Sequence, residues 1–558
     1  MKNYKLLIIV ISLLLSLNLS FAQSDAVSKG LNSITIESLK GQLEFLSSDY
    51  TEGRETGTKG NMLAGDYIAS LFRIYGIKPA GDIQMKNPSW RDWRKGRRPE
   101  SIPTYFQNFN LINSEPGDHQ ELSIIKVKDD NKEILSFGYR TDFDIYSSLA
   151  NIELEAPVVF VGYGYKNEEK GYNDFAGVDV KGKIILRLPG YPGIKDTSSE
   201  AFKIFKPKDR RDEWGLSRDK NRWAKDAGAL GVIEIIDNRN FPRDWTVNIP
   251  LRYNTPTYEG ETELHPGKYD NMSIPGDTIS SRLINIVVTN RVANKIIEKS
   301  NISISEFEKY AAEKLKPASK DIDDLIIRIK SQTKTNLIGT RNILGLIEGE
   351  DKDEVIVIGA HYDHVGMANG YIWNGADDNA SGTVGVLALA KAFSEAGVKP
   401  KKSIMFALWT GEEKGLLGSE YFVSNPPPSI KKILLNLNYD MISRNDSEDS
   451  LGVNCSMNYT KAYPAFKELS EKYNKELDLG LNIEFEASDR PGGGSDHAPF
   501  AEKDIPIFYF MAGFHDDYHK PSDTADKADY KKMMKIIKLG FRDIWDLAND
   551  EGIFKEVK

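Results

Sequence analysis

The chain has 558 residues, of which 40% are hydrophobic and 28% charged, and its formal net charge is −9. This length exceeds one ordinary domain, so we expect two domains with full hydrophobic cores. The acidic balance argues against a general nucleic-acid-binding protein, because neutralising phosphates requires a basic surface.

The N-terminus has the layout of a secretory signal peptide. Basic residues precede an apolar run from Leu6 to Leu19, and Ala22 precedes the polar Gln23. That run is shorter than the roughly 20 residues that a membrane span requires. We therefore expect residues 1–22 to be cleaved and the mature protein to be secreted or periplasmic, without stable membrane insertion. The single cysteine, Cys455, cannot form a disulfide within the chain, so stability must come from packing or metal.

Two amphipathic helices are predicted next, because apolar residues recur at spacings near three and four over Ile36–Leu46 and Met62–Tyr75. A turn-rich segment, Ser48–Thr58, separates them. Farther on, Trp90–Arg98 is a local basic and aromatic cluster that in isolation suggests nucleic-acid binding. Since the acidic chain offers no supporting patch, an exposed insertion loop is the better interpretation.

From Glu121 the sequence changes to short strand-like segments separated by Gly, Asn, Asp and Pro turns. We expect an inserted, strand-rich second domain over residues 121–315. The segment Gly162–Lys183, followed by Ala224–Ala229, resembles the protease-associated domain found inserted in several secreted peptidases. That resemblance implies a domain without catalytic residues of its own.

Helices and strands alternate from residue 316 to the end. Strands are predicted near residues 355, 404, 434 and 505, with helices after Ser381, near Gly418 and Ala462, and over Tyr530–Leu547. This alternation predicts an α/β fold with a mostly parallel sheet flanked by helices on both faces. Residues 23–120 and 316–558 would together form this domain.

Three of these predicted strands end in side chains that bind metals. The strands near residues 355, 404 and 434 are followed by His361, by Glu412 and Glu413, and by Asp440. Because the carboxyl ends of parallel strands share one edge of a sheet, we expect these side chains to converge.

The chemistry of zinc fits this set. Zinc is bound by histidine nitrogens and carboxylate oxygens, and two neighbouring ions require a bridging carboxylate. Asp378, in the glycine-flanked segment Gly375–Gly382, and one more histidine would complete the set; His519 follows the predicted strand Ile507–Met511. Each element alone is weak, since a lone histidine is more often structural. Their order and their positions at strand ends favour a metal site.

At these residues the sequence resembles the co-catalytic di-zinc aminopeptidase family, whose relatives include glutamate carboxypeptidase, transferrin receptor ectodomains and glutaminyl cyclases. The resemblance covers about Leu39 to Leu547, apart from the inserted domain. It implies two zinc ions as cofactors. It assigns one ion to His361 and Asp440, the other to Glu413 and His519, and the bridging position to Asp378.

The resemblance also implies a role for Glu412, and physical chemistry indicates roles for two further residues. Glu412 would be the general base, taking a proton from water and returning it to the leaving amine. Asp363 is expected to orient His361, and Tyr518 could donate a hydrogen bond to the developing oxyanion. Each role depends on placement that spacing alone does not give.

Four other residues that could bind a metal lie near these motifs. Asp377 is expected to be a neighbour and not a ligand, because the family's bridging aspartate directly precedes the asparagine, here Asn379. The roles of His364, His497 and His515 stay open. The loop Gly492–His497 resembles a family loop near the site, but His497 is not a usual ligand.

The expected function is an exported zinc exopeptidase, an aminopeptidase acting on peptides. A carboxypeptidase or dipeptidase stays open, because the metal core is shared and specificity groups lie on loops. A glutaminyl cyclase fits less well, since those relatives work with one zinc and the inserted domain does not suit them. A non-catalytic binding protein on the same fold would have lost ligands or the base, whereas this chain has all six.

Overall fold

The computed structural model describes residues 24–554 except 129–130, 140, 146–150, 209, 236–270, 277–282, 369–370, 428, 447–448 and 551. The predicted signal peptide, residues 1–22, lies outside the described residues. The chain divides into two compact units: unit 1, Met1–Leu111 with Ile338–Lys558, and unit 2, Ile112–Leu337. Within the described part of the chain, no helix combines the length and apolar character needed to cross a bilayer.

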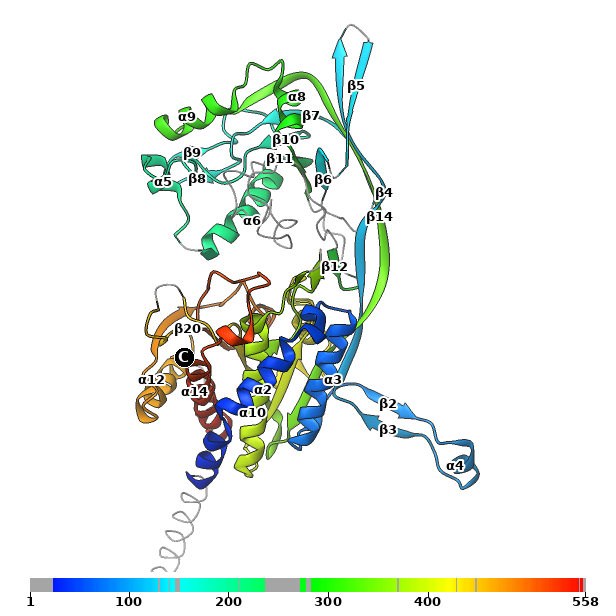
Figure 1. Cartoon of the computed structure of the whole chain (residues 1–558), viewed down its shortest axis with the longest axis vertical. Coiled ribbons are helices and arrows are strands. Elements are labelled where there is room, and N and C mark those ends of the chain that lie inside the picture. The colour runs from blue at the N-terminus through cyan, green and yellow to red at the C-terminus, as the bar shows by residue number, and fades with distance from the viewer. Residues whose placement is uncertain are drawn as a thin grey trace, which may run out of the picture. The chain divides into compact units, whose positions relative to one another are not determined.

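The sheet of unit 1 is mostly parallel (Figure 1). In spatial order its strands are β21 (Asn482–Ser488), β20 (Asn454–Thr460), β22 (Ile507–Met511), β19 (Ile433–Tyr439), β15 (Asp351–His361), β18 (Lys402–Trp409) and the end of β14 (Lys320–Ile347). The four central strands are parallel, whereas β14 is antiparallel to β18 and β20 is antiparallel to β22. The predicted α/β class is thereby confirmed.

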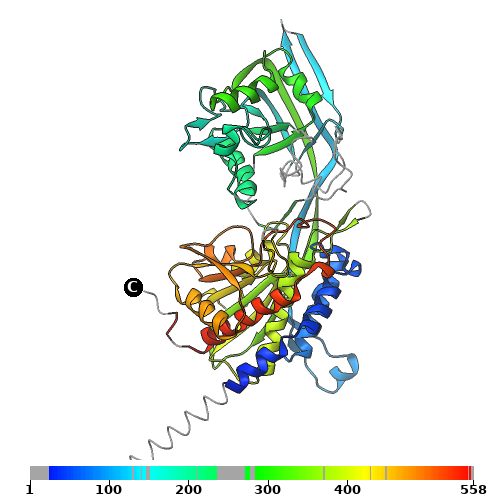
Figure 2. The same cartoon turned by 60° about the vertical axis from the view of Figure 1, so that its left-hand side comes forward.

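Side chains alternate between the two faces of this sheet along each strand, and both faces are buried under helices. In β15, Ile356 and Ile358 belong to the larger core, while Val355 and Val357 belong to a second core on the opposite face. The larger core is covered by α2 (Ile36–Leu46), α3 (Lys59–Ile74), α10 (Gly382–Ala396), α12 (Ala465–Glu476) and α14 (Tyr530–Asn549). The other face is covered by α11 (Leu417–Ser424) and α13 (Ala498–Glu502). Figure 2 shows α14 and the N-terminal helices over the same face.

The N-terminal helices begin at side-chain caps. Thr35 accepts a hydrogen bond from the Ser38 N–H, and Thr58 accepts one from the Asn61 N–H. The second helix therefore starts at Lys59, three residues before the predicted start. The segment Trp90–Arg98 is partly helical, since α4 (Trp90–Arg94) connects β2 (Ile83–Lys86) to β3 (Glu100–Pro103).

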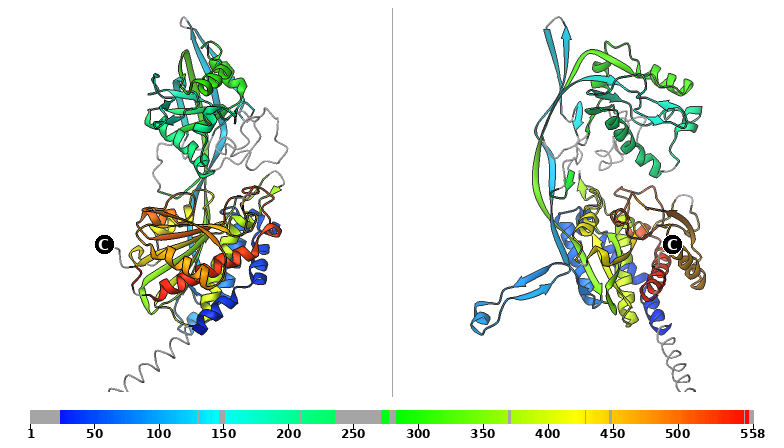
Figure 3. Two further views of the ribbon diagram at one scale, coloured as in Figure 1. Left: turned by 90° about the vertical axis from the view of Figure 1, so that its left-hand side faces the viewer. Right: turned by 180° about the vertical axis from the view of Figure 1, so that it is seen from behind.

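In unit 2 the sheet continues from β14, with helices packed against it (Figure 3). Its strands in order are the start of β14, then β7 (Ile152–Phe160), β10 (Ile184–Arg187), β11 (Gly231–Ile235), β13 (Ile284–Val288) and β6 (Phe143–Ile145). Its helices are α5 (Glu200–Phe205), α6 (Arg210–Asp226), α8 (Asn290–Ile297) and α9 (Ile304–Lys314). The remaining strands are β1 (Lys78–Pro79), β4 (Phe106–Lys128), β5 (Asn131–Phe137), β8 (Lys166–Asn167), β9 (Tyr172–Asn173), β12 (Asn271–Ser273), β16 (Met367–Ala368) and β17 (Tyr371–Ile372).

The chain crosses between the units inside two long strands, β4 and β14. The compact unit Ile112–Leu337 is wider than the predicted insertion of residues 121–315, because the unit includes parts of both strands. The identification of this insertion as a protease-associated domain stays a prediction.

Candidate metal centre

The predicted metal-binding side chains gather at one edge of the unit 1 sheet. Strands β18 and β19 both run parallel to β15, so the residues that follow them lie beside the end of β15. The short helical turn Ala376–Ser381 and the loop after β22 add further side chains. The result is two groups of possible ligands: His361, Glu412 and Asp440, and His364, Asp378, Glu413 and His519.

The first group surrounds His361, which is buried at the end of β15. Its Nε2 lies 3.5 Å from Asp440 Oδ1 and 3.5 Å from Asp378 Oδ1. Glu412 Oε2 is slightly farther away, at 3.8 Å. One imidazole nitrogen therefore faces three carboxylates.

The second group surrounds His519. Its Nε2 lies 2.6 Å from Asp378 Oδ2 and 3.0 Å from Glu413 Oε1. Asp378 thus directs Oδ1 toward His361 and Oδ2 toward His519. This carboxylate is the one that reaches both groups through different oxygens, which is the arrangement that a bridging ligand requires.

Burial disfavours the ionised form of the carboxylates at this edge of the sheet. It raises the pKa of Asp378 well above its usual range, and the nearby Glu413 carboxylate raises it further. Burial likewise raises the pKa of Glu412. Burial alone would lower the pKa of His361, but Glu412 and Asp440 outweigh that effect and raise it. Divalent cations would favour the ionised form of these carboxylates.

The donor atoms fit zinc. Nε2 of His361 and Nδ1 of His364 are buried and make no hydrogen bond. Buried polar atoms normally have partners, so these two nitrogens suit coordination to a cation. Histidine nitrogens combined with carboxylate oxygens are the ligands that zinc takes in proteins. A shared carboxylate between two such groups suits a pair of ions.

Asp363 contacts the loop that carries the two glutamates. Its carboxylate accepts hydrogen bonds from the N–H groups of Glu412, at 3.2 Å, and Glu413, at 3.4 Å. The Thr56 hydroxyl donates to the same carboxylate at 2.9 Å. Nδ1 of His361 lies closer to the main-chain oxygen of Asp363, at 3.2 Å, than to its carboxylate, at 3.7 Å. Asp363 therefore touches both His361 and the glutamate loop.

The glycine-rich loop 492–497 reaches the site through a serine. The Ser495 hydroxyl donates to Asp440 Oδ2 at 2.6 Å, and the side-chain amide of Asn438 donates to the Ser495 oxygen at 2.8 Å. This leaves Asp440 Oδ1 facing His361. His497 belongs to neither group, and its ring stacks on Tyr509 at 4.6 Å.

Asp377 points to different partners from Asp378. Its Oδ1 accepts hydrogen bonds from the N–H and the hydroxyl of Ser443, at 2.7 and 2.8 Å. Its Oδ2 lies 3.3 Å from Nε2 of His515. Asp523 accepts hydrogen bonds from the N–H groups of both Asp377 and Asp378. Asp377 and His515 thus lie outside both ligand groups.

Tyr518 lies directly beside the second group. Its ring stacks on that of His519, with the centroids 3.8 Å apart and the planes at 20°. The side chain is half-buried, and Phe514 packs edge-on against it at 5.2 Å. This places an aromatic hydroxyl residue next to a possible metal ligand.

One residue of the site was not singled out from the sequence. Arg54, in the turn-rich segment Ser48–Thr58, is fully buried. Its guanidinium donates to the main-chain oxygens of Tyr362, at 2.9 Å, Asn374, at 2.7 Å, and Gly375, at 2.8 Å. Arg54 has a φ of 50°, a conformation that costs an L-residue about 1–2 kcal/mol, which these bonds offset. The only hint in the sequence is the density of Gly and polar residues between two helices.

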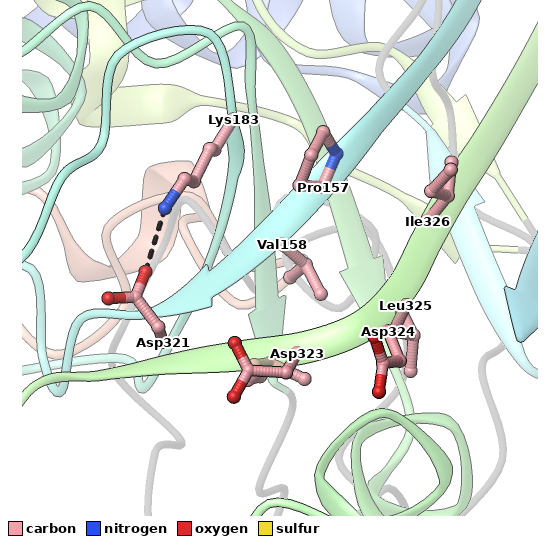
Figure 4. Close-up of a pocket in the computed structure, with 9 residues that line it drawn as sticks. Pro157, Val158, Lys183, Asp321, Asp323, Asp324, Leu325 and Ile326 are labelled. Carbon is pink, nitrogen blue, oxygen red and sulfur yellow. Dashed lines mark hydrogen bonds and ion pairs between the residues drawn. The ribbon is translucent and has the colours of Figure 1, made fainter. Parts of the chain in front are cut away.

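Unit 2 contains a pocket of about 530 Å³ (Figure 4). Among its lining residues, Lys183 Nζ contacts Asp321 Oδ1 at 2.7 Å, and the carboxylates of Asp323 and Asp324 lie along the same segment of β14. No described residue that lines it is a histidine. It therefore lacks the mixed nitrogen and oxygen donors of the edge in unit 1.

Several known peptidases are similar in sequence to parts of this chain. Leupeptin-inactivating enzyme 1 of Streptomyces exfoliatus is 34% identical over 187 residues, which are 33% of this chain and 38% of that protein. A glutamate carboxypeptidase 2 homolog of Caenorhabditis briggsae is 26% identical over 409 residues, 64% of this chain and 48% of that protein. Leucine aminopeptidase 2 of Trichophyton rubrum is 30% identical over 205 residues, 35% of this chain and 39% of that protein. The chain thus spans less than half the length of these curated relatives.

A solved structure shares the fold. The aminopeptidase from Aneurinibacillus sp. strain AM-1 superimposes with a TM-score of 0.54 and 19% sequence identity, covering 95% of this chain and 98% of that one. Residues 342–541 match the model described as peptidase family M28, and this range contains both ligand groups. Over these residues the chain is similar to peptidase family M28.

Proposed function

We propose that this chain is an exported di-zinc exopeptidase that acts as an aminopeptidase on peptides. The observation that carries the proposal is the position of Asp378, whose two carboxylate oxygens face His361 and His519 separately. His361 and Asp440 would hold one ion, Glu413 and His519 the other, and Asp378 both. The leucine aminopeptidase among the relatives supports the choice of exopeptidase.

The two adjacent glutamates would have different roles in the reaction. When bound at this site, zinc would supply positive charge that lowers the pKa of a water and polarises the peptide carbonyl. Glu413 Oε1 faces His519 and would serve as a ligand, whereas Glu412 lies at the margin of the first group. Glu412 takes the proton from the attacking water and passes it to the nitrogen of the leaving amine as the C–N bond breaks.

Neighbouring residues hold this arrangement in place. The Asp363 carboxylate accepts the N–H groups of both glutamates, which fixes the loop relative to His361. Tyr518, held against the His519 ring, donates from its hydroxyl to the oxyanion that develops on the carbonyl. Preorganised donors of this kind need no rearrangement during the reaction.

A carboxypeptidase is the second candidate. The alignment with a glutamate carboxypeptidase 2 homolog extends over 64% of this chain, farther than the one with leucine aminopeptidase 2. A receptor-like binding protein is a weaker alternative, because it would have no need for the general base Glu412. Substrate blocking separates the two enzymes, and any turnover excludes the binding protein.

The test combines metal analysis with a panel of blocked peptides. Purified mature protein should hold two zinc ions per chain after loading and dialysis. It should cleave a tripeptide with a free amino group and an amidated C-terminus, and it should fail on the N-acetylated tripeptide with a free carboxylate. The opposite preference would identify a carboxypeptidase, and turnover of neither peptide would contradict exopeptidase function.

Export and the role of unit 2 are parts of the same proposal. N-terminal sequencing of the protein from a periplasmic or culture fraction should begin at Gln23; an intact Met1 would contradict cleavage. Both ligand groups lie in unit 1, which supports the view that unit 2 is a protease-associated domain without catalytic residues. Asp323→Asn in unit 2 should accordingly leave the zinc content unchanged.

A further inference from the structure

Building on the proposed zinc centre, we infer that His364 is a fourth protein ligand of the second metal position, beside Asp378, Glu413 and His519. The sequence left the role of this histidine open. The inference concerns the coordination of the two ions, and it makes the two positions chemically different.

The donor atoms of His364 and of the other three ligands converge. Nδ1 of His364 lies 2.9 Å from Glu413 Oε1 and 3.9 Å from Asp378 Oδ2. Zinc ligands lie about 2.1 Å from the ion, so two ligands of one ion are at most about 4.2 Å apart. The distances from His364 fall within this limit, as do those from His519 to the same carboxylates.

Apart from the approach of Nδ1 to two carboxylates, the ring nitrogens of His364 have no described polar partner. The side chain is fully buried, and neither Nδ1 nor Nε2 makes a hydrogen bond. The 2.9 Å approach to Glu413 therefore lacks hydrogen-bond geometry. A buried nitrogen directed at two carboxylates without a hydrogen bond is what a shared cation would explain.

The fold holds the His364 ring in this orientation without a hydrogen bond to either ring nitrogen. The main-chain N–H of His364 donates to the main-chain oxygen of Arg54 at 3.2 Å. Its ring lies over Gly375, where a Cβ atom would come within 2.4 Å of His364 Cδ2. The other side faces the His519 ring, with centroids 5.4 Å apart. Packing fixes the imidazole and leaves Nδ1 for the metal.

The consequence is a division between the two positions. The second would have four protein ligands, which is typical of closed zinc sites. The first would have His361, Asp378 and Asp440, because Glu412, although only 3.8 Å from His361, is the base in the proposed function. Three protein ligands leave one coordination position open for water or substrate. Glu412 Oε2 lies 3.8 Å from His361 Nε2, beside this first position. We therefore expect the reacting water and carbonyl at the first position and tighter metal retention at the second.

The rival explanation is that His364 only supports Glu413 from outside the coordination sphere. His364→Asn separates the two, because the asparagine amide nitrogen lies near the position of Nδ1 and can donate a hydrogen bond but is a poor zinc ligand. If His364 is a ligand, His364→Asn and His364→Ala should both weaken zinc binding at the second position by more than about 100-fold. Loss of an outer partner weakens it by about 10–100-fold.

Zinc affinity is measured by chelator competition on the full chain, with His497→Asn as the matched buried control. If His364→Asn keeps the zinc affinity of the wild type while His364→Ala loses it, the inference is overturned. A crystal structure of zinc-loaded wild-type protein provides a test independent of variant folding: Nδ1 of His364 should lie about 2.1 Å from the ion, and a distance above about 3 Å would overturn it. Wild-type protein that holds fewer than two ions would instead contradict the proposed function, and this ligand with it.

Discussion

The guanidinium of Arg54 donates from Nε to the main-chain oxygen of Tyr362, the residue between His361 and Asp363, at 2.9 Å. Its other nitrogens bond the oxygens of Asn374 and Gly375, just before Asp378. One buried side chain therefore ties together two loops that carry proposed ligands. Arginine suits this task, because its planar group offers five donors in a fixed geometry.

We expect Arg54→Met to destabilise unit 1 and to reduce its zinc affinity. Each buried carbonyl left without a donor costs about 1–3 kcal/mol, so the loss over several oxygens should reach at least about 3 kcal/mol. Arg54→Lys should be intermediate, since lysine reaches fewer acceptors at once. Urea unfolding and zinc competition provide the measurements, with the exposed Arg91→Met as control. Equal stability of the two methionine variants would contradict the role of Arg54.

The two neighbouring aspartates should differ in their effect on zinc. Asp378→Asn removes a charged oxygen from between His361 and His519, so both ions should bind less tightly. Asp377→Asn disturbs contacts to Ser443 and His515 and should retain more zinc. Elemental analysis of both variants after dialysis makes the comparison. Equal zinc loss would mean that the bridging aspartate has been misassigned.

The stability of unit 2 should depend on pH through Asp174. Burial raises the pKa of this carboxyl to about 7, although hydrogen bonds from Tyr163 and Tyr165 act in the opposite direction. An unfolded aspartate has a pKa of about 3.9. Between these values the folded state holds a proton that the unfolded state has lost, so stability falls as pH rises through this window.

Asp174→Asn should remove most of this pH dependence. Each pKa unit corresponds to about 1.4 kcal/mol, so wild-type protein should lose a few kcal/mol between pH 4 and pH 7 that the variant does not lose. Chemical unfolding at several pH values, followed by a probe in unit 2, measures the difference. The exposed Asp179→Asn is the control and should match wild type. Parallel pH curves for Asp174→Asn and wild type would exclude this origin.

Much of the fold could be predicted because its determinants are local. Apolar runs such as Val355–Ala360 show buried parallel strands directly, and parallel strands bring their carboxyl ends to one edge. β14 was missed for a physical reason. Over Lys320–Ile347 partly buried charged residues such as Arg328 and Lys330 interrupt the apolar pattern, and these residues pair with Glu155 and Glu153 across the sheet.

Some residues of the candidate site could likewise be predicted from the sequence, and others could not. His361 and Asp440 follow strands immediately, so strand prediction places them near each other. His519 lies on a loop several residues after β22, and only a family resemblance pointed to it. Arg54 bonds main-chain oxygens, which every residue has, so no sequence pattern distinguishes its partners. The orientation of His364 depends on its packing over Gly375, which lies on another loop.

The sharpest prediction separates the two adjacent glutamates. Glu412→Gln keeps the size of the side chain and its capacity for hydrogen bonds, but the amide cannot accept a proton from water. Both zinc ions should therefore stay bound, while kcat falls by about two to four orders of magnitude, the usual contribution of general acid–base catalysis. Glu413→Gln replaces an anionic oxygen that faces His519, so zinc affinity should fall together with activity.

The measurement is kinetics on an unblocked aminoacyl substrate, with zinc analysis of each variant at the same pH. The two substitutions are chemically identical and affect consecutive residues whose N–H groups both bond Asp363, so each variant is a control for the other. Zinc loss in Glu412→Gln with zinc retention in Glu413→Gln would exchange the two roles. Full activity of Glu412→Gln would refute the proposed mechanism, because no other carboxylate in the two groups is left without an assigned metal to serve as the base.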